Sequence, residues 1–183
     1  MLQKVSDRII VVDDMPSIAE IIAERLRIAG FENITTYMDP HEALTAIRSN
    51  TRPAIVITDF NMPGLTGVEL LDEIDQHHPE IDGVVVTGNT SAAREPPHRY
   101  LVIDKATDFY PELIAHILGI IRSHVRPLLD ACPAGAEKPD CPLKGIRVLS
   151  VSEKMEWLAA LRPADIHPLI RHHLSCMRAA GAV

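Results

Sequence analysis

Five short apolar runs alternate with segments that have the apolar spacing of amphipathic helices through residues 1–126. Parallel strands need long crossover connections, and helices in those crossovers cover both faces of the sheet. The alternation therefore predicts an α/β protein built on a doubly wound, five-stranded parallel sheet. The strands are expected over residues 8–12, 33–37, 54–58, 84–86 and 100–103.

Residues typical of helix ends fall between these runs. Pro16 and Gly30 bracket a first helix, and Thr66 with Glu69 forms a capping-box pattern for a later one. A helix between the fourth and fifth strands must be short, because a helix interior cannot accept the prolines at 96–97. The residues expected on the inward face of the first helix are Ile18, Ile21, Ile22, Leu26 and Ala29.

The chain is expected to contain a sheet domain over residues 1–126, a linker over 127–145 and a helical C-terminal extension over 146–183. In the extension, Ser150 and Glu153 form a capping-box pattern for one helix, and a second helix is expected over about 165–180. Two short amphipathic helices cannot bury their apolar faces against each other alone. We therefore expect the extension to mediate homodimer formation or docking of a partner.

Composition excludes several classes of protein. No apolar run approaches the roughly 20 residues that a membrane span needs, and the N-terminal residues lack the pattern of a signal peptide. The three cysteines have irregular spacing, which favours a reduced, cytoplasmic setting. Residues 1–126 hold 11 Lys/Arg and 19 Asp/Glu, whereas residues 144–183 have a balance of +3. An acidic main body makes nucleic acid an improbable partner, and no membrane contact is expected.

Polar side chains follow four of the expected strands. Asp13-Asp14 follows the first, Asp59 the third, Thr87 ends the fourth, and Lys105 follows the fifth. In open parallel sheets the ligand site lies at the carboxyl ends of the strands, so these groups should share one crevice. Clustered carboxylates need a cation, and Mg²⁺ prefers such oxygen ligands. A carboxylate nucleophile beside a hydroxyl and an ammonium suits the formation of an aspartyl phosphate.

The chain resembles the receiver domain of two-component response regulators, which implies a flavodoxin-like sheet. The resemblance covers about residues 5–126. The matching residues are Asp13-Asp14, Asp59-Phe60-Asn61-Met62-Pro63-Gly64-Leu65-Thr66-Gly67, Thr87-Gly88 and Lys105.

The resemblance implies a role for each matched residue. Asp59 would accept a phosphoryl group from a sensor histidine kinase or a phosphotransfer protein. Asp14, Asp59 and the backbone carbonyl of Asn61 would bind Mg²⁺ directly, and Asp13 would bind it largely through water. The phosphoryl-sensing residues would be Thr87 and Lys105, and the positions that tune dephosphorylation would be Asn61 and Asn89.

Three departures from the family pattern concern how phosphorylation is signalled. One is that the region between Thr87 and Lys105 is short and broken by the prolines at 96–97. The position three before the lysine, usually aromatic, is Val102, and the residue after the lysine, usually proline, is Ala106. These departures leave the phosphorylation chemistry intact but put the usual switch in doubt.

Two alternatives to this function stay open. One is a DNA-binding transcriptional regulator, although about 38 residues after the linker are few for the usual output domain. The other is a phosphatase similar to haloacid dehalogenases, which needs a second Asp where this chain has Asn61. We expect a phospho-accepting regulator rather than an enzyme, with at most self-phosphorylation from small donors and autodephosphorylation.

Overall fold

The computed structural model of the protein describes residues 6–49, 52–95, 98–132, 134–135 and 138–180. The chain forms two compact units. The first, called here the sheet unit, is Arg8–Ile117. The second, the helical unit, begins at Leu118 and includes Ser6 and Asp7. The boundary lies within one long helix, and the linker expected over 127–145 stays a prediction.

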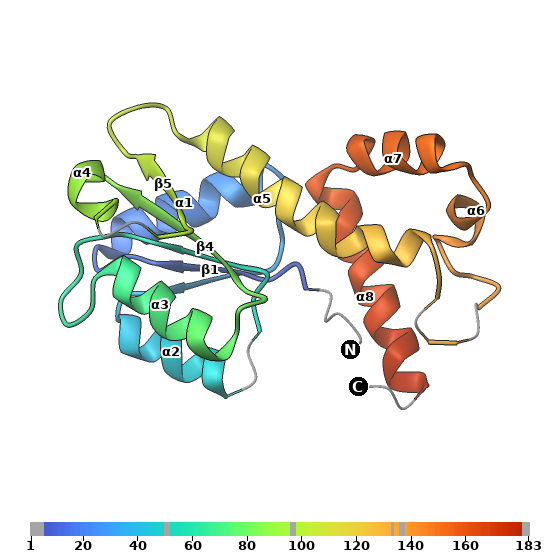
Figure 1. The fold of residues 1–183 in the computed structure, drawn as a ribbon, viewed down its shortest axis with the longest axis horizontal. Helices are drawn as coiled ribbons and strands as arrows, with labels where there is room; N and C mark the ends of the chain where they lie inside the picture. Colours follow the sequence, from blue (N-terminus) through green and yellow to red (C-terminus); the bar gives the residue numbers. More distant parts are fainter. Residues whose placement is uncertain (1–5, 50–51, 96–97, 133, 136–137, 181–183) are drawn as a thin grey trace. The chain divides into compact units, whose positions relative to one another are not determined.

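A single five-stranded sheet forms the centre of the sheet unit (Figure 1). All neighbouring strands are parallel, in the order β2-β1-β3-β4-β5. This arrangement confirms the predicted fold class, and β4 is longer at its start than the pattern of valines indicated. The strands are β1 (Ile9–Val12), β2 (Ile34–Tyr37), β3 (Ile55–Thr58), β4 (Asp82–Thr87) and β5 (Leu101–Asp104).

Helices cover both faces of this sheet. Ile10, Val12, Val56 and Val85 point into the core beneath α2 and α3, whereas the alternate strand residues face α1 and α5. The residues of β1 and β3 and all but the first of β4 are buried, whereas those of the edge strand β2 are half-buried, as expected for a parallel sheet between two helical layers. The helices are α1 (Pro16–Ile28), α2 (Pro40–Arg48), α3 (Gly67–His77), α4 (Thr90–Ala93) and α5 (Tyr110–Val125).

The predicted helix signals are confirmed, with one error in the inward face of α1. Thr66 and Glu69 form the expected capping box at the start of α3. Ile21, expected inward, is 50% exposed, because α1 turns Ala19 and Ala23 toward the sheet instead. Small residues at the contact let a helix lie close to the sheet. The four-residue α4 is short, as expected, and the prolines from which this was predicted lie outside the described residues.

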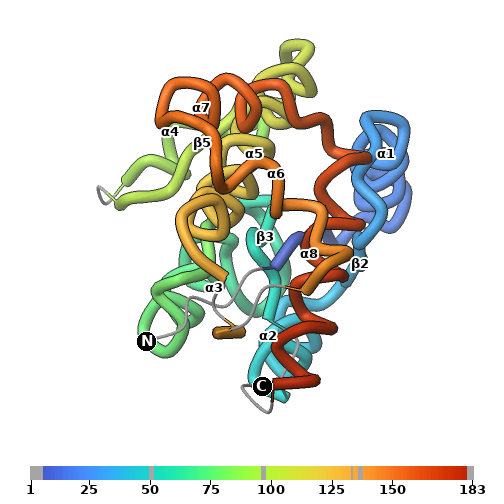
Figure 2. Tube along the Cα trace, turned by 90° about the vertical axis from the view of Figure 1, so that its right-hand side faces the viewer, coloured from blue at the N-terminus to red at the C-terminus, as the bar shows by residue number. Residues whose placement is uncertain are grey.

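The helical unit contains the end of α5 and four further elements. Ser150 and Glu153 cap α7 as predicted. Pro163 not only follows α7 but begins α8, two residues before the expected start, and Pro168 lies inside α8 on its exposed side. The elements are η1 (Arg126–Leu129), α6 (Lys144–Arg147), α7 (Val151–Ala160) and α8 (Pro163–Ala179), which Figure 2 follows in chain order.

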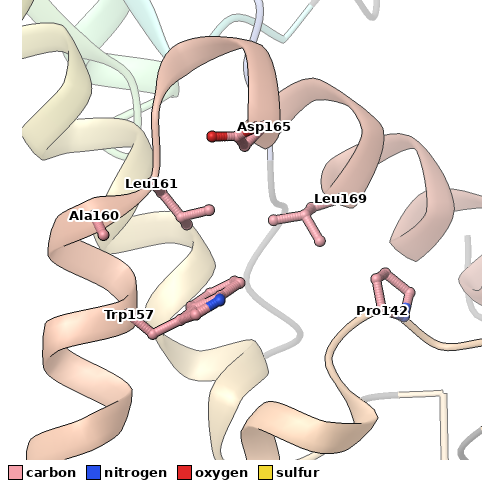
Figure 3. Close-up of a pocket in the computed structure, with 6 residues that line it drawn as sticks. All are labelled: Pro142, Trp157, Ala160, Leu161, Asp165 and Leu169. Atoms are coloured by element: carbon pink, nitrogen blue, oxygen red, sulfur yellow. The ribbon is translucent and has the colours of Figure 1, made fainter.

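Apolar side chains of α7 and α8 pack within the helical unit. Arg122 of α5 donates a hydrogen bond to the carbonyl oxygen of Leu161 at 2.6 Å, which satisfies the end of α7. A shallow hollow separates α7 from α8, and its walls include the indole ring of Trp157 and the side chain of Leu169 (Figure 3). None of the helices in the described parts of the chain is both long and apolar enough to cross a bilayer.

Candidate functional site

The sheet places the predicted polar residues at one edge. Hydrogen bonds continue the ladder one residue past the strand ends, from Asp59 N to Val12 O at 2.9 Å and from Lys105 N to Thr87 O at 3.0 Å. The backbones of Asp59 and Lys105 are therefore fixed by the sheet rather than by a free loop. Asp13 follows β1 directly and is joined to β2 by a bond from its N–H to Tyr37 O.

Lys105 bridges two of the predicted carboxylates. Its Nζ lies 2.8 Å from Asp13 Oδ2 and 2.8 Å from Asp59 Oδ1. The Asp13 side chain is only 3% exposed, and that of Asp59 is also largely buried. Burial by itself would lower the pKa of the Lys105 ammonium, but the hydrogen bonds to Asp13 and Asp59 outweigh burial, so the pKa is raised. Lys105 is thus held as a charged group between two anions.

The second oxygen of each carboxylate also has a donor. Asp59 Oδ2 accepts a hydrogen bond from the N–H of Asn61 at 2.8 Å, and Asp13 Oδ1 accepts one from the N–H of Met15 at 3.0 Å. Both side chains are therefore held in one orientation by four hydrogen bonds. A buried carboxylate with this many partners is held in a fixed direction, as a nucleophile or metal ligand requires.

Gly67 fixes the loop that carries Asp59. Its N–H donates to the carbonyl oxygen of Phe60 at 3.0 Å, so the loop closes onto the first turn of α3. A Cβ at this position would lie 2.1 Å from the backbone oxygen of Asp59, a distance that no pair of non-bonded atoms tolerates. The predicted family motif contained this glycine, but only the structure shows why another residue would not fit.

Thr87 and Asn89 lie beside this centre but bond to each other. Thr87 is fully buried, and its Oγ1 accepts a hydrogen bond from the N–H of Asn89 at 3.1 Å. The hydroxyl proton of Thr87 is left available for a further acceptor. The Asn89 side chain points to the next helix, where its Oδ1 accepts from the N–H of Ala92 at 3.4 Å.

The predicted metal ligands meet only in part. Asp14 is exposed beside the buried Asp13, and Asn61 is exposed beside Asp59. Across the described ranges, no three carboxylate, imidazole or thiol groups converge in a way that could hold a metal ion. The buried pair Asp13 and Asp59 nevertheless already converges on one cation, the Lys105 ammonium.

This donor set fits Mg²⁺. Two carboxylates around one ammonium leave an excess negative charge, and hard oxygen donors are what Mg²⁺ prefers. The exposed Asp14 and the Asn61 carbonyl lie next in sequence to the two buried ligands, where they can complete a shell together with water. The residues that would hold the ion are therefore Asp13, Asp14, Asp59 and Asn61.

Val102 does not take the place of an aromatic switch. Its side chain is buried in the core cluster beneath α2 and α3, and it is too small to change between an inward and an outward position as an aromatic ring does. The nearby aromatic residue is Tyr100, just before β5, whose role the sequence did not indicate.

Comparison with known proteins agrees with this geometry. Residues 9–97 match the model of the response regulator receiver domain. The chain is 33% identical over 116 residues to the DNA-binding transcriptional regulator NtrC of Salmonella typhimurium, covering 58% of this chain and 24% of that protein. It is 43% identical over 63 residues to the DNA-binding response regulator MtrA of Mycolicibacterium smegmatis, covering 34% of this chain and 27% of that one. The chain thus spans about a quarter of the length of these relatives.

Solved structures with the same fold are receiver domains. The response regulator TrrA of Thermotoga maritima, in complex with Mg²⁺ and a beryllium fluoride, superposes with a TM-score of 0.52 at 30% identity, covering 60% of this chain and 97% of that one. A response regulator receiver domain protein of Clostridium thermocellum gives 0.55 at 27% identity, covering 67% and 98%. Phosphorylation on aspartate and Mg²⁺ are characteristic of this family. The chain belongs to the response regulator receiver domains of two-component systems.

Proposed function

We propose that this protein is a response regulator that accepts a phosphoryl group on Asp59 and passes the signal on through protein contacts. The observation that carries the proposal is the fixed orientation of Asp59, whose two oxygens are held by Lys105 and by the N–H of Asn61. A carboxylate held in this way needs little reorganisation before it attacks phosphorus.

The residues of the site suit transfer from a phosphohistidine. A carboxylate oxygen of Asp59 forms the new P–O bond while the P–N bond to the donor breaks, and the histidine nitrogen leaves with the electron pair. Lys105 and the free hydroxyl proton of Thr87 then bind phosphoryl oxygens. Mg²⁺, when bound, neutralises charge on the transferred group. We propose that Asn61 and Asn89, both exposed, influence how water reaches the product.

Intact mass spectrometry tests this proposal directly. The protein is incubated with Mg²⁺ and acetyl phosphate, and the wild type is expected to gain one phosphoryl group. Asp59→Asn should gain none, whereas Asp75→Asn, a matched change at an exposed aspartate bound to Arg99, should behave as wild type. Equal gain in Asp59→Asn would show that another residue accepts the group. We propose that the protein has no catalytic activity beyond slow self-phosphorylation from small donors and autodephosphorylation.

We propose the exposed side of α1 as the docking surface for the kinase or phosphotransfer protein. Met15 directly follows Asp14, and Ile21 and Ile28 continue along the same helix as large exposed apolar residues. Isolated apolar residues are common on surfaces, but Ile21 and Ile28 are seven residues apart and so lie on one side of α1, and Met15 is its N-cap. We propose that the partner contacts this side of α1. Phosphohistidine and acetyl phosphate are formed in the cytoplasm, which we propose as the compartment.

We propose that the helical unit forms the homodimer contact. Val148 is 84% exposed and Val151 is 75% exposed, at the start of α7. A second copy that covered both valines would remove apolar surface from water. The solution mass of the full-length protein, measured with and without phosphorylation, checks this contact. Val148→Asp with Val151→Asp should yield monomer, and a dimer unchanged by both substitutions would contradict it.

DNA binding stays a second candidate, because the relatives NtrC and MtrA are DNA-binding regulators by name. The matched residues cover only about a quarter of those proteins, so the likeness does not extend to their whole length. Arg171 and Arg178 are exposed on one side of α8 and are the groups that DNA phosphates would contact. Loss of duplex binding in Arg171→Ala with Arg178→Ala, measured at fixed salt, would support this candidate; no binding by the wild type excludes it.

A further inference from the structure

Thr87 is the first member of a hydrogen-bonded chain that leads away from the phosphoacceptor. The Thr87 hydroxyl oxygen accepts from the N–H of Asn89 at 3.1 Å, and Asn89 in turn caps α4 through the N–H of Ala92 at 3.4 Å. The Asn89 carbonyl also accepts from the N–H of Ala93 at 3.1 Å. Asn89 therefore connects the buried hydroxyl to both ends of a single helical turn.

His98 continues the chain from the end of α4 to β5. Its Nε2 lies 2.5 Å from the carbonyl oxygen of Ala93, and its Nδ1 lies 3.2 Å from the backbone nitrogen of Tyr100. A carbonyl only accepts and an N–H only donates, so the imidazole must carry its proton on Nε2. The ring also packs on the Tyr100 ring, with the ring centroids 5.1 Å apart. His98 thus holds α4 and Tyr100 together through both nitrogens.

Tyr100 anchors the far end of the chain to α3. Its hydroxyl donates to Asp72 at 2.8 Å, and its ring lies over Gly83, where a Cβ would come within 3.0 Å of Tyr100 Cδ1. Burial, followed by the hydrogen bond to Asp72, raises the pKa of the Tyr100 hydroxyl above its usual range. Arg99 lies beside the same ring, and both residues border an open hollow at the amino-terminal ends of β4 and β5.

The two ends of this hydrogen-bonded chain lie at opposite ends of the strands, Thr87 at the carboxyl end and Tyr100 at the amino end. Thr87 ends β4, whereas Tyr100 precedes β5 and lies level with Gly83, because Val84 pairs with Leu101. Four residues of strand separate the two levels, which is about 13 Å. The series of hydrogen bonds from Thr87 to Asp72 therefore leads from the carboxyl end of β4 to the amino end of β5 without following either strand.

We propose that this chain, from Thr87 through Asn89, α4 and His98 to Tyr100, carries the phosphorylation state of Asp59 to the opposite edge of the sheet. The inference rests on the proposed function of Asp59. The Thr87 hydroxyl can donate its proton to a phosphoryl oxygen while it still accepts from the N–H of Asn89, so movement of the hydroxyl toward the phosphoryl group draws Asn89 with it. Because Asn89 caps α4, α4 shifts as well. His98 is the positioning residue that transmits this shift to the backbone of Tyr100.

Because α4 is short, such a shift needs little free energy. A helix of four residues has one turn and little stability of its own, so its position depends on the groups that hold its ends. Those groups are the Asn89 side chain at the start and the His98 imidazole at the end. Ala93 anchors the turn in the core, so that α4 can pivot without leaving the sheet unit. This route needs no aromatic residue at Val102.

Amide chemical shifts of the full-length protein test the chain link by link. Beryllofluoride with Mg²⁺ serves as the probe, because it imitates the phosphoryl group without being transferred. In the wild type, the amides of Asn89, Ala92 and Tyr100 are expected to shift. In His98→Ala the Asn89 shift should persist and the Tyr100 shift should be lost. His116→Ala is the matched control, because His116 borders the same hollow without bonding to α4.

Further variants keep the test decisive if His98→Ala folds poorly. His98→Gln keeps one donor and one acceptor, so it should restore part of the Tyr100 response. Asn89→Ala keeps the backbone N–H that bonds to Thr87 but removes the side-chain cap on α4, so the amide of Tyr100 should lose most of its response while the amide of Thr87 still responds. A Tyr100 response of wild-type size in His98→Ala or Asn89→Ala would overturn the inference and leave phospho-acceptance standing. A wild type in which no amide shifts and acetyl phosphate adds no mass would instead overturn the proposed function, and the inference with it.

Discussion

Replacing Gly67 by alanine is expected to disturb the phosphoacceptor loop more than any change of similar size elsewhere in the sheet unit. The added Cβ would lie 2.1 Å from the backbone oxygen of Asp59 and 2.8 Å from Cγ2 of Thr58. Carbon and oxygen atoms rarely approach closer than about 3.3 Å, so either α3 or the Asp59 backbone must move by roughly 1 Å. Neither moves easily, because α3 packs on the core through Leu70 and Leu71, and Asp59 N is bonded to Val12 O.

The cost follows from the rigidity of both neighbours. Overpacked substitutions typically cost 1–3 kcal/mol, and a clash with backbone belongs at the upper end, so we expect about 3 kcal/mol. For a unit of this size that lowers the melting temperature by roughly 15 °C. A displacement of roughly 1 Å at a reacting group can slow a reaction by about 100-fold, so phosphorylation should slow by a similar factor.

Thermal unfolding and the rate of mass gain with acetyl phosphate measure the two effects separately. Gly119→Ala is the matched control, since a Cβ there meets nothing within 4 Å and the residue lies inside α5. That change should stabilise the protein by roughly 0.5–1 kcal/mol and leave phosphorylation unchanged. If Gly67→Ala melts with the wild type and accepts the phosphoryl group at the same rate, the close approach to Asp59 does not constrain the loop, and the reasoning is wrong.

Three other outcomes follow from single contacts. Tyr100→Phe removes the hydrogen bond to Asp72 and should lower the free energy of unfolding, measured by chemical denaturation, by about 1.5–3 kcal/mol. Because the pKa of Tyr100 is raised in the folded protein, the wild type should also lose stability as the pH rises above about 10, and the variant should lose less. Burial, followed by the charges of Arg147 and His172, lowers the pKa of His173. The helical unit should therefore lose stability as the pH falls below about 6.5, and His173→Gln should remove this dependence. The fluorescence of the single tryptophan can follow the unfolding. Ile21→Asp should slow phosphotransfer from a histidine kinase at least tenfold but leave the reaction with acetyl phosphate unchanged; equal slowing of both would contradict docking on α1.

The features that sequence predicted well are those that repeat or that need a particular residue type. Buried parallel strands are continuous apolar runs, and the capping boxes at Thr66 and Ser150 are short patterns with a defined hydrogen-bond geometry. The topology then places Asp13, Asp59 and Lys105 at one edge, because every parallel strand ends there. Contacts of the site residues thus follow from chain order and strand direction.

Other features were missed for physical reasons. Ile21 was expected inward because periodicity gives the spacing of an apolar face but not its rotation, and here two alanines set the rotation. α8 was expected to begin at about residue 165 but begins at Pro163, because a proline fits the first position of a helix, where its missing N–H would have no partner in the helix. The close approach of Gly67 to the backbone of Asp59 depends on how the loop between them folds, which the spacing of apolar residues does not predict.

The segment between Thr87 and Lys105 shows why the phosphorylation site can be predicted from sequence more fully than the structural response to phosphorylation. Phosphoryl chemistry depends on groups at strand ends, and the sheet fixes their positions whatever the loops do. Readout depends on a four-residue helix whose ends are held by side chains, and a single imidazole, His98, sets where it ends relative to β5. A change at His98 can therefore alter the output without altering the acceptance of the phosphoryl group. Two receivers with the same site residues can in this way respond to phosphorylation differently, and the difference lies in the irregular segment rather than in the site.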